Sequence, residues 1–132
     1  MKRGLTMDVK FFKCLHCGNV AIKPWDAGVP LVCCGEKMHE LIANSEDAAT
    51  EKHVPVVTVN GSAVHVEVGE VAHPMTEEHL IAFVVLVTKK GYQVAQLTAA
   101  DAPVADFAVA EGDEPVKVYE YCNLHGLWVK EL

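Results

Sequence analysis

The stretch "YEYCNLHGLW", from Tyr119 to Trp128, places a cysteine and a histidine three residues apart. Neither a disulfide nor a packed core needs the pair Cys122 and His125. Thiolate sulfur and imidazole nitrogen are, however, donors by which proteins hold zinc, copper and iron. The pairing therefore indicates a metal site.

Three further histidines extend this pattern. His53 lies in "EKHVP", and "VAHPMTEEHL" supplies His73 and His79. The proline after His73 biases it toward extended backbone, which suits a loop that presents side chains. With Cys122 and His125 the set offers four imidazoles and one thiolate, whereas a structural zinc site usually stops at four ligands and blue copper adds a methionine. Five donors around an octahedral ion leave one position open, as expected of a reactive ferrous site.

The other four cysteines occur as two pairs near the start of the chain. "CLHC" carries Cys14 and Cys17, and "VCCG" carries Cys33 and Cys34. A C-x-x-C turn brings two sulfurs to one ion, and a second pair from a facing turn completes a tetrahedron. Because neighbouring side chains must both bend to one centre, we expect some distortion of the tetrahedron. This spacing favours zinc and iron equally, and a strained vicinal disulfide between the last two cysteines is the remaining alternative.

The other histidines are expected to lie outside both sites. His16 and His39 are close to the cysteine pairs in sequence, but four thiols already fill a tetrahedral site, so both are expected at the surface. His65 alternates with valines along a strand and is expected to face solvent.

Composition limits the classes of protein to consider. The chain has 132 residues, 51% of them hydrophobic, and a formal net charge of −7, which argues against nucleic acid or an anionic membrane as the main partner. No apolar run approaches the ~20 residues that a membrane span needs. The start, "MKRGLTMDVKFFK", is basic but lacks an apolar signal core, so we expect a cytoplasmic protein that begins at Met1 or Met7. Five cysteines, an odd number, favour metal or redox use over a disulfide framework.

The chain divides into two parts of different composition. Residues 1–42 hold four of the five cysteines with several glycines and prolines, and few large apolar residues. We expect them to form a small domain whose bound metal replaces a hydrophobic core. The polar segment "ANSEDAATEKH", residues 43–53, is expected to connect it to the rest of a second domain, residues 43–132.

The second domain has the pattern of successive strands. "VPVVTV" and "AVHVEV" flank an Asn-Gly pair at residues 60–61, which is a strong hairpin signal. "LIAFVVLVT", residues 80–88, is apolar throughout, as in a strand that is covered on both faces. Further strand-like runs are "YQVAQLT", "ADFAVA", "PVKVYEYC" and "LWVKEL". Short strands at this spacing predict an antiparallel sandwich or barrel.

Taken together, the motifs resemble those of one known family. "FFKCLHCGNV", "LVCCGEKM", "EKHVPVV", "VGEVAHPMTEEHLIAFV" and "YCNLHGLW" are similar to desulfoferrodoxin, the two-iron form of superoxide reductase, over nearly the whole chain. The resemblance implies an all-β protein. A small desulforedoxin- or rubredoxin-like metal domain at residues 1–42 would precede an immunoglobulin-like antiparallel β-sandwich at residues 43–132, which carries the catalytic centre.

The resemblance also implies two iron ions per chain. A rubredoxin-type iron would be held by four thiolates: Cys14, Cys17, Cys33 and Cys34. A catalytic iron would be held by four equatorial imidazoles and one axial thiolate: His53, His73, His79, His125 and Cys122.

The implied reaction is the one-electron reduction of superoxide to hydrogen peroxide. Glu51 and Lys52 match the active-site loop of the family, in which the glutamate occupies the sixth position of the resting ferric ion and the lysine lies near the open site. The lysine would give a small anion a positive target on an acidic molecule. The resemblance further implies a homodimer, rubredoxin as electron donor, and an accessory role for the four-thiolate iron.

Two other interpretations remain open from the sequence. A non-enzymatic two-iron electron-transfer protein would explain the cysteines but neither an open coordination position nor Lys52. A zinc-stabilised binding module on a β-sandwich would explain the first site, but it leaves the four histidines and Cys122 as a coincidence. Metal analysis and the detection of peroxide distinguish these possibilities.

Overall fold

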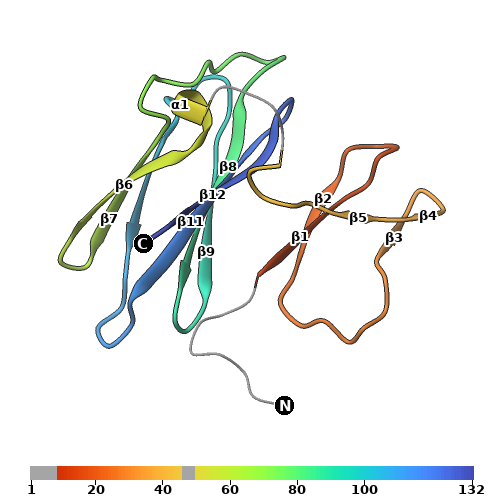
Figure 1. Ribbon diagram of the computed structural model, residues 1–132, viewed down its shortest axis with the longest axis horizontal. Helices are drawn as coiled ribbons and strands as arrows, with labels where there is room; N and C mark the ends of the chain where they lie inside the picture. Colours follow the sequence, from red (N-terminus) through yellow and green to blue (C-terminus); the bar gives the residue numbers. More distant parts are fainter. Residues whose placement is uncertain (1–8, 46–49) are drawn as a thin grey trace. The chain divides into compact units, whose positions relative to one another are not determined.

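The computed structural model describes residues 9–45 and 50–132 (Figure 1). The chain forms two compact units, of which one lies within Asp8–Ile42 and the other within Ala43–Leu132. None of the described residues forms a helix that is long and apolar enough to cross a membrane.

The smaller unit is built from very short strands. Three of them form an antiparallel sheet in the order β2-β1-β5, and two form a separate hairpin. The strands are β1 (Lys10–Lys13), β2 (Val20–Lys23), β3 (Val32–Cys33), β4 (Glu36–Lys37) and β5 (His39–Glu40). Its buried hydrophobic side chains are Val9, Phe11 and Cys14, whereas Trp25 is 77% exposed. So few apolar contacts do not form an ordinary hydrophobic core.

The larger unit contains two antiparallel sheets. One has three strands in the order β10-β7-β6, and the other has four in the order β12-β11-β8-β9. The strands are β6 (Pro55–Asn60), β7 (Ala63–Val68), β8 (Ile81–Thr88), β9 (Tyr92–Gln96), β10 (Val104–Ala108), β11 (Pro115–Cys122) and β12 (Gly126–Glu131). The prediction of an all-β protein, with a cysteine-rich metal unit before an antiparallel sandwich, is thereby confirmed.

Alternation along the strands places the core between the two sheets. Val64, Val66 and Val68 of β7 are fully buried and belong to the same apolar cluster as Val84 and Leu86 of β8. The predicted hairpin pairs Asn60 with Ala63 across the Asn-Gly turn. On the opposite face of β8, Val85 and Val87 are also fully buried. β8 is therefore covered on both faces, as its continuous apolar run predicted.

The segment expected as a polar connector ends in a short helix. α1 (Thr50–His53) is one helical turn, and the Val54 amide donates a hydrogen bond to the Thr50 carbonyl at 3.0 Å. His53 is therefore the last residue of a helix and not part of an irregular connector. Such a short helix has no apolar periodicity that a sequence pattern would reveal.

His65 lies on the outer face of the three-stranded sheet, between two carboxylates. Its Nδ1 is 2.6 Å from Asp106 Oδ1 on β10, and its Nε2 is 3.1 Å from Glu67 Oε2. The hydrogen bond with Asp106, and then that with Glu67, raise the pKa of His65. The side chain faces outward, as predicted, and forms a pair of ionic contacts that the sequence pattern did not indicate.

The two ionic contacts of His65 make the stability of the sandwich depend on pH. Because the pKa of His65 is raised in the folded state, its contribution is complete below the ordinary histidine pKa of about 6.5 and is lost as pH rises through the raised pKa. We expect the free energy of unfolding of His65→Gln to fall below that of the unsubstituted protein at about pH 5.5 and to converge with it at about pH 9. Chemical denaturation at the two pH values measures the difference, and an equal difference at both would contradict the ionic role of His65.

Candidate metal centres

The four cysteines of the small unit converge on one point. The sulfur atoms of Cys14, Cys17, Cys33 and Cys34 all lie within 4.8 Å of one another. Cys17 Sγ is 3.6 Å from Cys33 Sγ, and Cys33 Sγ is 4.0 Å from Cys34 Sγ. All four are free thiols, and the last distance is far above a disulfide bond length of ~2.05 Å, so the vicinal disulfide is not formed.

The backbone around the cysteines curls so that the sulfurs face inward. The Gly18 amide donates to the Cys14 carbonyl at 2.9 Å, and Gly18 has a φ of +86°. Cys34 has a φ of +54°, which is rare for a residue with a side chain. This left-handed conformation lets two consecutive cysteines both turn toward one centre. The distortion of the tetrahedron stays a prediction.

Hydrogen bonds and thiol pKa values indicate that this cluster is built for a cation. The Cys17 amide donates to Cys14 Sγ at 3.4 Å and lowers the pKa of Cys14 to about 6. The side-chain contacts with Cys17 and then Cys14 raise the pKa of Cys34 to about 12, because a second anion beside the first is unfavourable. All four sulfurs can therefore be anionic together only with a metal ion between them.

The second group of donors lies in the sandwich. Donor atoms of His53, His79, Cys122 and His125 all lie within 4.8 Å of one another. His53 Nε2 is 3.1 Å from His125 Nδ1 and 3.2 Å from His73 Nε2, so His73 adjoins the same cluster. Cys122 Sγ is 3.8 Å from His125 Nδ1. The structure thus brings together the four histidines and the cysteine that the sequence singled out.

Three separate segments, which lie at the same end of the sandwich (Figure 1), supply these five side chains. α1 ends at His53, and the loop between β7 and β8 carries His73 and His79. β11 ends at Cys122, and the turn that follows it carries His125. The loop is fixed locally by Thr76, whose amide donates to the His79 carbonyl at 2.9 Å and whose carbonyl accepts from the His79 amide at 3.2 Å.

Two neighbouring residues hold the segments to one another, and sequence reasoning assigned them no role. Asn123 accepts from the Leu80 amide at 3.0 Å and donates to the Glu78 carbonyl at 3.0 Å, which ties the turn of Cys122 to the loop of His79. Trp128 stacks on His53 with ring centroids 4.9 Å apart. Its indole N–H donates to the His125 carbonyl at 3.0 Å. Both residues lie within the motif "YCNLHGLW", but nothing in their types reveals these contacts.

The imidazoles of this cluster are suited to binding a metal. Burial, and then the neighbouring His53, lower the pKa of His73 to about 4, although its Nδ1 contacts the Pro74 carbonyl at 2.7 Å. When Nδ1 donates that hydrogen bond, Nε2 keeps a free lone pair. Burial, and then the neighbouring His125, also lower the pKa of His79. Its Nε2 is buried without a hydrogen-bond partner among the described residues, which is costly unless the nitrogen binds a cation.

The cysteine of this cluster is deeply buried. Burial raises the pKa of the Cys122 thiol, so a thiolate here requires a nearby cation. Glu120, two residues earlier on β11, is also fully buried, and neither of its oxygens has a hydrogen-bond partner among the described residues. Burial raises the pKa of Glu120 to about 9, so it is a neutral acid at neutral pH and adds no ligand charge.

The two remaining candidate residues, Glu51 and Lys52, both belong to α1. Lys52 is the penultimate residue of α1, and its side chain is exposed. Its positive charge, after burial and the neighbouring histidines, contributes to the lowered pKa of His79. The Glu51 side chain lies outside the part of the chain that the structure describes. His16 and His39 are exposed, and neither belongs to the two donor clusters found among the described residues.

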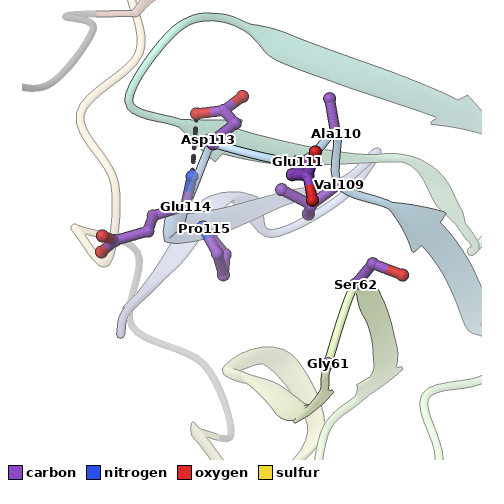
Figure 2. A pocket seen from close by; sticks show the side chains of 9 residues that line it. Gly61, Ser62, Val109, Ala110, Glu111, Asp113, Glu114 and Pro115 are labelled. Carbon is purple, nitrogen blue, oxygen red and sulfur yellow. Dashed lines mark hydrogen bonds between the residues drawn. The ribbon is translucent and has the colours of Figure 1, made fainter.

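A cavity of about 540 Å³ lies elsewhere on the sandwich, between the β6–β7 turn and the loop before β11 (Figure 2). Its lining includes Glu111, Asp113 and Glu114, but none of the residues of the two donor clusters. Asp113 accepts hydrogen bonds from the Thr88 hydroxyl at 2.6 Å and from the Glu114 amide at 2.9 Å, so its carboxylate is committed to the loop. The cavity therefore lies apart from both donor clusters.

An antiparallel sandwich that gathers four imidazoles and a thiolate, joined to a small unit with four thiols, defines a class of non-haem metalloproteins with two centres. The Desulfoferrodoxin family model matches residues 45–131. The chain belongs to the desulfoferrodoxin family.

Individual relatives cover both units. A desulfoferrodoxin of Syntrophotalea carbinolica is 43% identical over 93% of this chain and 96% of its own length. The crystal structure of the superoxide reductase from Treponema pallidum is 41% identical, covers 94% of this chain and 99% of its own, and has a TM-score of 0.80. A superoxide reductase from Giardia intestinalis, described as a 1Fe form, is 36% identical over 62% of this chain and 99% of its own, with a TM-score of 0.53. The family and the two donor clusters together confirm the prediction of two iron centres.

Proposed function

We propose that this protein is a superoxide reductase, which converts superoxide, one electron and two protons into hydrogen peroxide. The observation that carries the proposal is the cluster of four imidazoles and one thiolate in a family whose members include named superoxide reductases. Five donors leave a six-coordinate ion one position for a small ligand. A zinc-stabilised binding module has no use for such a position.

The side chains around the metal centre have different roles. His53, His73, His79 and His125 would hold the ion with neutral nitrogen donors, and Cys122 would add the single negative charge from within the core. When bound, iron supplies an electron that superoxide can take up. The stack of Trp128 on His53 and the two hydrogen bonds of Asn123 hold the three ligand-bearing segments to one another.

Lys52 is proposed as the residue that attracts the substrate. Superoxide is an anion, and the chain has a formal net charge of −7, so the molecule as a whole repels it. An exposed ammonium group next to His53 reverses the local field at the place where the substrate must arrive.

Glu51 is proposed as a further ligand of the oxidised centre, as the family resemblance implies. We expect Glu51→Ala to keep the rate of the first encounter with superoxide within about twofold, because attraction depends on Lys52. The same variant should have an altered absorption spectrum in the ferric state. Stopped-flow or pulse-radiolysis kinetics and the ferric spectrum test the two parts separately, and a spectrum identical to that of the unsubstituted protein would remove Glu51 from the ligand set.

The four-thiolate centre is proposed as an accessory site that passes electrons or stabilises the dimer. The relative described as a 1Fe superoxide reductase aligns with only 62% of this chain. We expect Cys14→Ser to lose one of two iron equivalents and to keep superoxide reduction within about a factor of three of the unsubstituted protein. Metal analysis and the rate of peroxide formation measure this, and a folded variant without any activity would contradict the accessory role.

Residues 1–42 and 43–132 are proposed as the accessory and catalytic domains.

Further proposals concern the partners and the cellular location of the protein. Rubredoxin is the proposed electron donor and a homodimer the proposed assembly, as the family resemblance implies. A cytoplasmic location is proposed because all five cysteines are free thiols, as in a reducing compartment.

The proposed function is tested by the stoichiometry of the reaction. The iron-loaded protein, reduced without oxygen and mixed with superoxide, should form one hydrogen peroxide per superoxide consumed and release no oxygen. Oxygen release would indicate a dismutase. Absence of peroxide above the spontaneous rate, with both iron sites filled, would favour an electron-transfer protein.

A further inference from the structure

Gly69 is the first residue after β7 and has a φ of +85°. A Cβ atom at this position would lie 2.6 Å from both the carbonyl carbon and the carbonyl oxygen of Lys52. It would also lie 2.6 Å from the Val71 carbonyl oxygen. Non-bonded carbon atoms pack at ~3.5–4.0 Å, so a residue with a side chain could not approach the Lys52 and Val71 carbonyl groups this closely. Only glycine allows the chain after β7 to rest directly on the backbone of α1.

The peptide group that Gly69 contacts joins the two residues that matter most at this end of the sandwich. Its carbonyl belongs to Lys52, the proposed substrate-attracting cation, and its amide belongs to His53, one of the clustered imidazoles. The same turn continues to His73 four residues later. Gly69 therefore belongs to one of the segments that build the metal centre and lies directly against another.

Both sides of this contact are anchored, so neither can easily move away. On one side, Val68 pairs with Pro55 across the β6–β7 ladder, and its amide donates to the Pro103 carbonyl at 2.8 Å. On the other side, α1 is closed by the Val54 amide bonding to the Thr50 carbonyl at 3.0 Å. An added Cβ must therefore displace α1 or the turn that follows β7.

We propose that Gly69 is a positioning residue for Lys52: its missing side chain seats α1 at the distance from β7 that aims the ammonium group at the mouth of the histidine cluster. This inference rests on the proposed function of Lys52. It predicts that a substitution at Gly69, a residue without charge and without contact to substrate, changes the ionic-strength dependence of superoxide capture.

Gly61 provides a matched control at the other end of β7. It also has a positive φ, +61°, but a Cβ there would meet no atom within 4 Å. Alanine at Gly61 therefore introduces comparable backbone strain without displacing a neighbour. The comparison of Gly69→Ala with Gly61→Ala separates the close approach to Lys52 from the general cost of alanine in a left-handed conformation.

The experiment measures the second-order rate constant of superoxide capture by the reduced iron-loaded protein at several ionic strengths. We expect the rate constant of Gly69→Ala at low salt to be about tenfold lower than that of the unsubstituted protein. At high salt the two rate constants should approach one another, as they would after removal of a steering charge. Gly61→Ala should show the unsubstituted rate and salt dependence. In the Lys52→Ala background, Gly69→Ala should cause little further loss, because both changes remove the same interaction.

Three results from the Gly69→Ala protein would each overturn the proposal. One is a capture rate for Gly69→Ala equal to that for Gly61→Ala at every salt concentration. Another is an equal loss of rate from Gly69→Ala with and without Lys52. The last is a crystal structure of Gly69→Ala in which α1 and Lys52 keep their positions. This structural measurement does not depend on activity, so it still tests the geometry if the unsubstituted protein proves not to reduce superoxide.

A second variant covers the case in which Gly69→Ala does not fold. Val71→Gly loosens the same turn without adding an atom or changing the charge, and Val71 is already half exposed. It should lower capture at low salt in the same direction, by a smaller factor than Gly69→Ala. An unchanged rate in a folded Val71→Gly protein would overturn the proposal on its own.

Discussion

Removing the metal is expected to unfold residues 9–42 and to leave the sandwich folded. The small unit buries Val9, Phe11 and Cys14, while Trp25, Val29 and other large apolar side chains remain exposed. With so little core, its folding free energy must come from the four metal–sulfur bonds. The sandwich, in contrast, has a continuous core of fully buried valine, leucine and isoleucine side chains between its sheets.

Hydrogen exchange of the metal-free and iron-loaded full-length chain measures this difference residue by residue. The amides of β1 and β2 should lose essentially all protection without metal, whereas those of β7, β8 and β11 should keep theirs. Adding zinc should restore the protection of the small unit, because four thiolates bind either metal. Retained protection in metal-free β1 would mean that the small unit folds on its own contacts.

Lys52→Ala is expected to slow superoxide capture about tenfold at low ionic strength, since steering by a local charge changes association rates by about 10–10³-fold. The loss should shrink as salt is raised, because the Debye length falls to ~10 Å at 0.1 M. Pulse radiolysis of the reduced protein measures the rate constant at each salt concentration.

The matched control is Lys90→Ala, which removes the same charge from an exposed lysine in the loop between β8 and β9. It should leave the rate nearly unchanged, which separates a local effect from the change in net charge. If the two variants slowed capture equally at low salt, Lys52 would have no special place at the centre.

Much of the architecture could be predicted because its signals are local. The Asn-Gly turn and the alternating valines of β7 determine a hairpin and its buried face within a dozen residues. The cysteine pairs likewise carry their spacing in the sequence. The distant histidines were singled out by their residue type and number, and their roles as ligands of one ion by the family resemblance, because no local rule joins His53 to His125.

Most of the features that escaped prediction depend on contacts between segments distant in sequence. α1 is too short for periodicity, the stack of Trp128 on His53 joins β12 to α1, and Asn123 bridges two loops. The approach of Gly69 to Lys52 belongs to the same class, since a glycine in a sequence shows only that φ is free and not what lies beside it. Glu120, a carboxylic acid in a hydrophobic core, contradicts the burial pattern expected of its residue type.

The positions of the donors along the chain determine when each centre can be assembled during synthesis. All four thiols of the first cluster leave the ribosome with residues 14–34, so that site can take up its ion while most of the polypeptide is still being made. The imidazole cluster needs His125, which is added almost last, and the closing turn between β11 and β12. The three histidines made earlier in synthesis therefore cannot complete the cluster until the turn between β11 and β12 has formed.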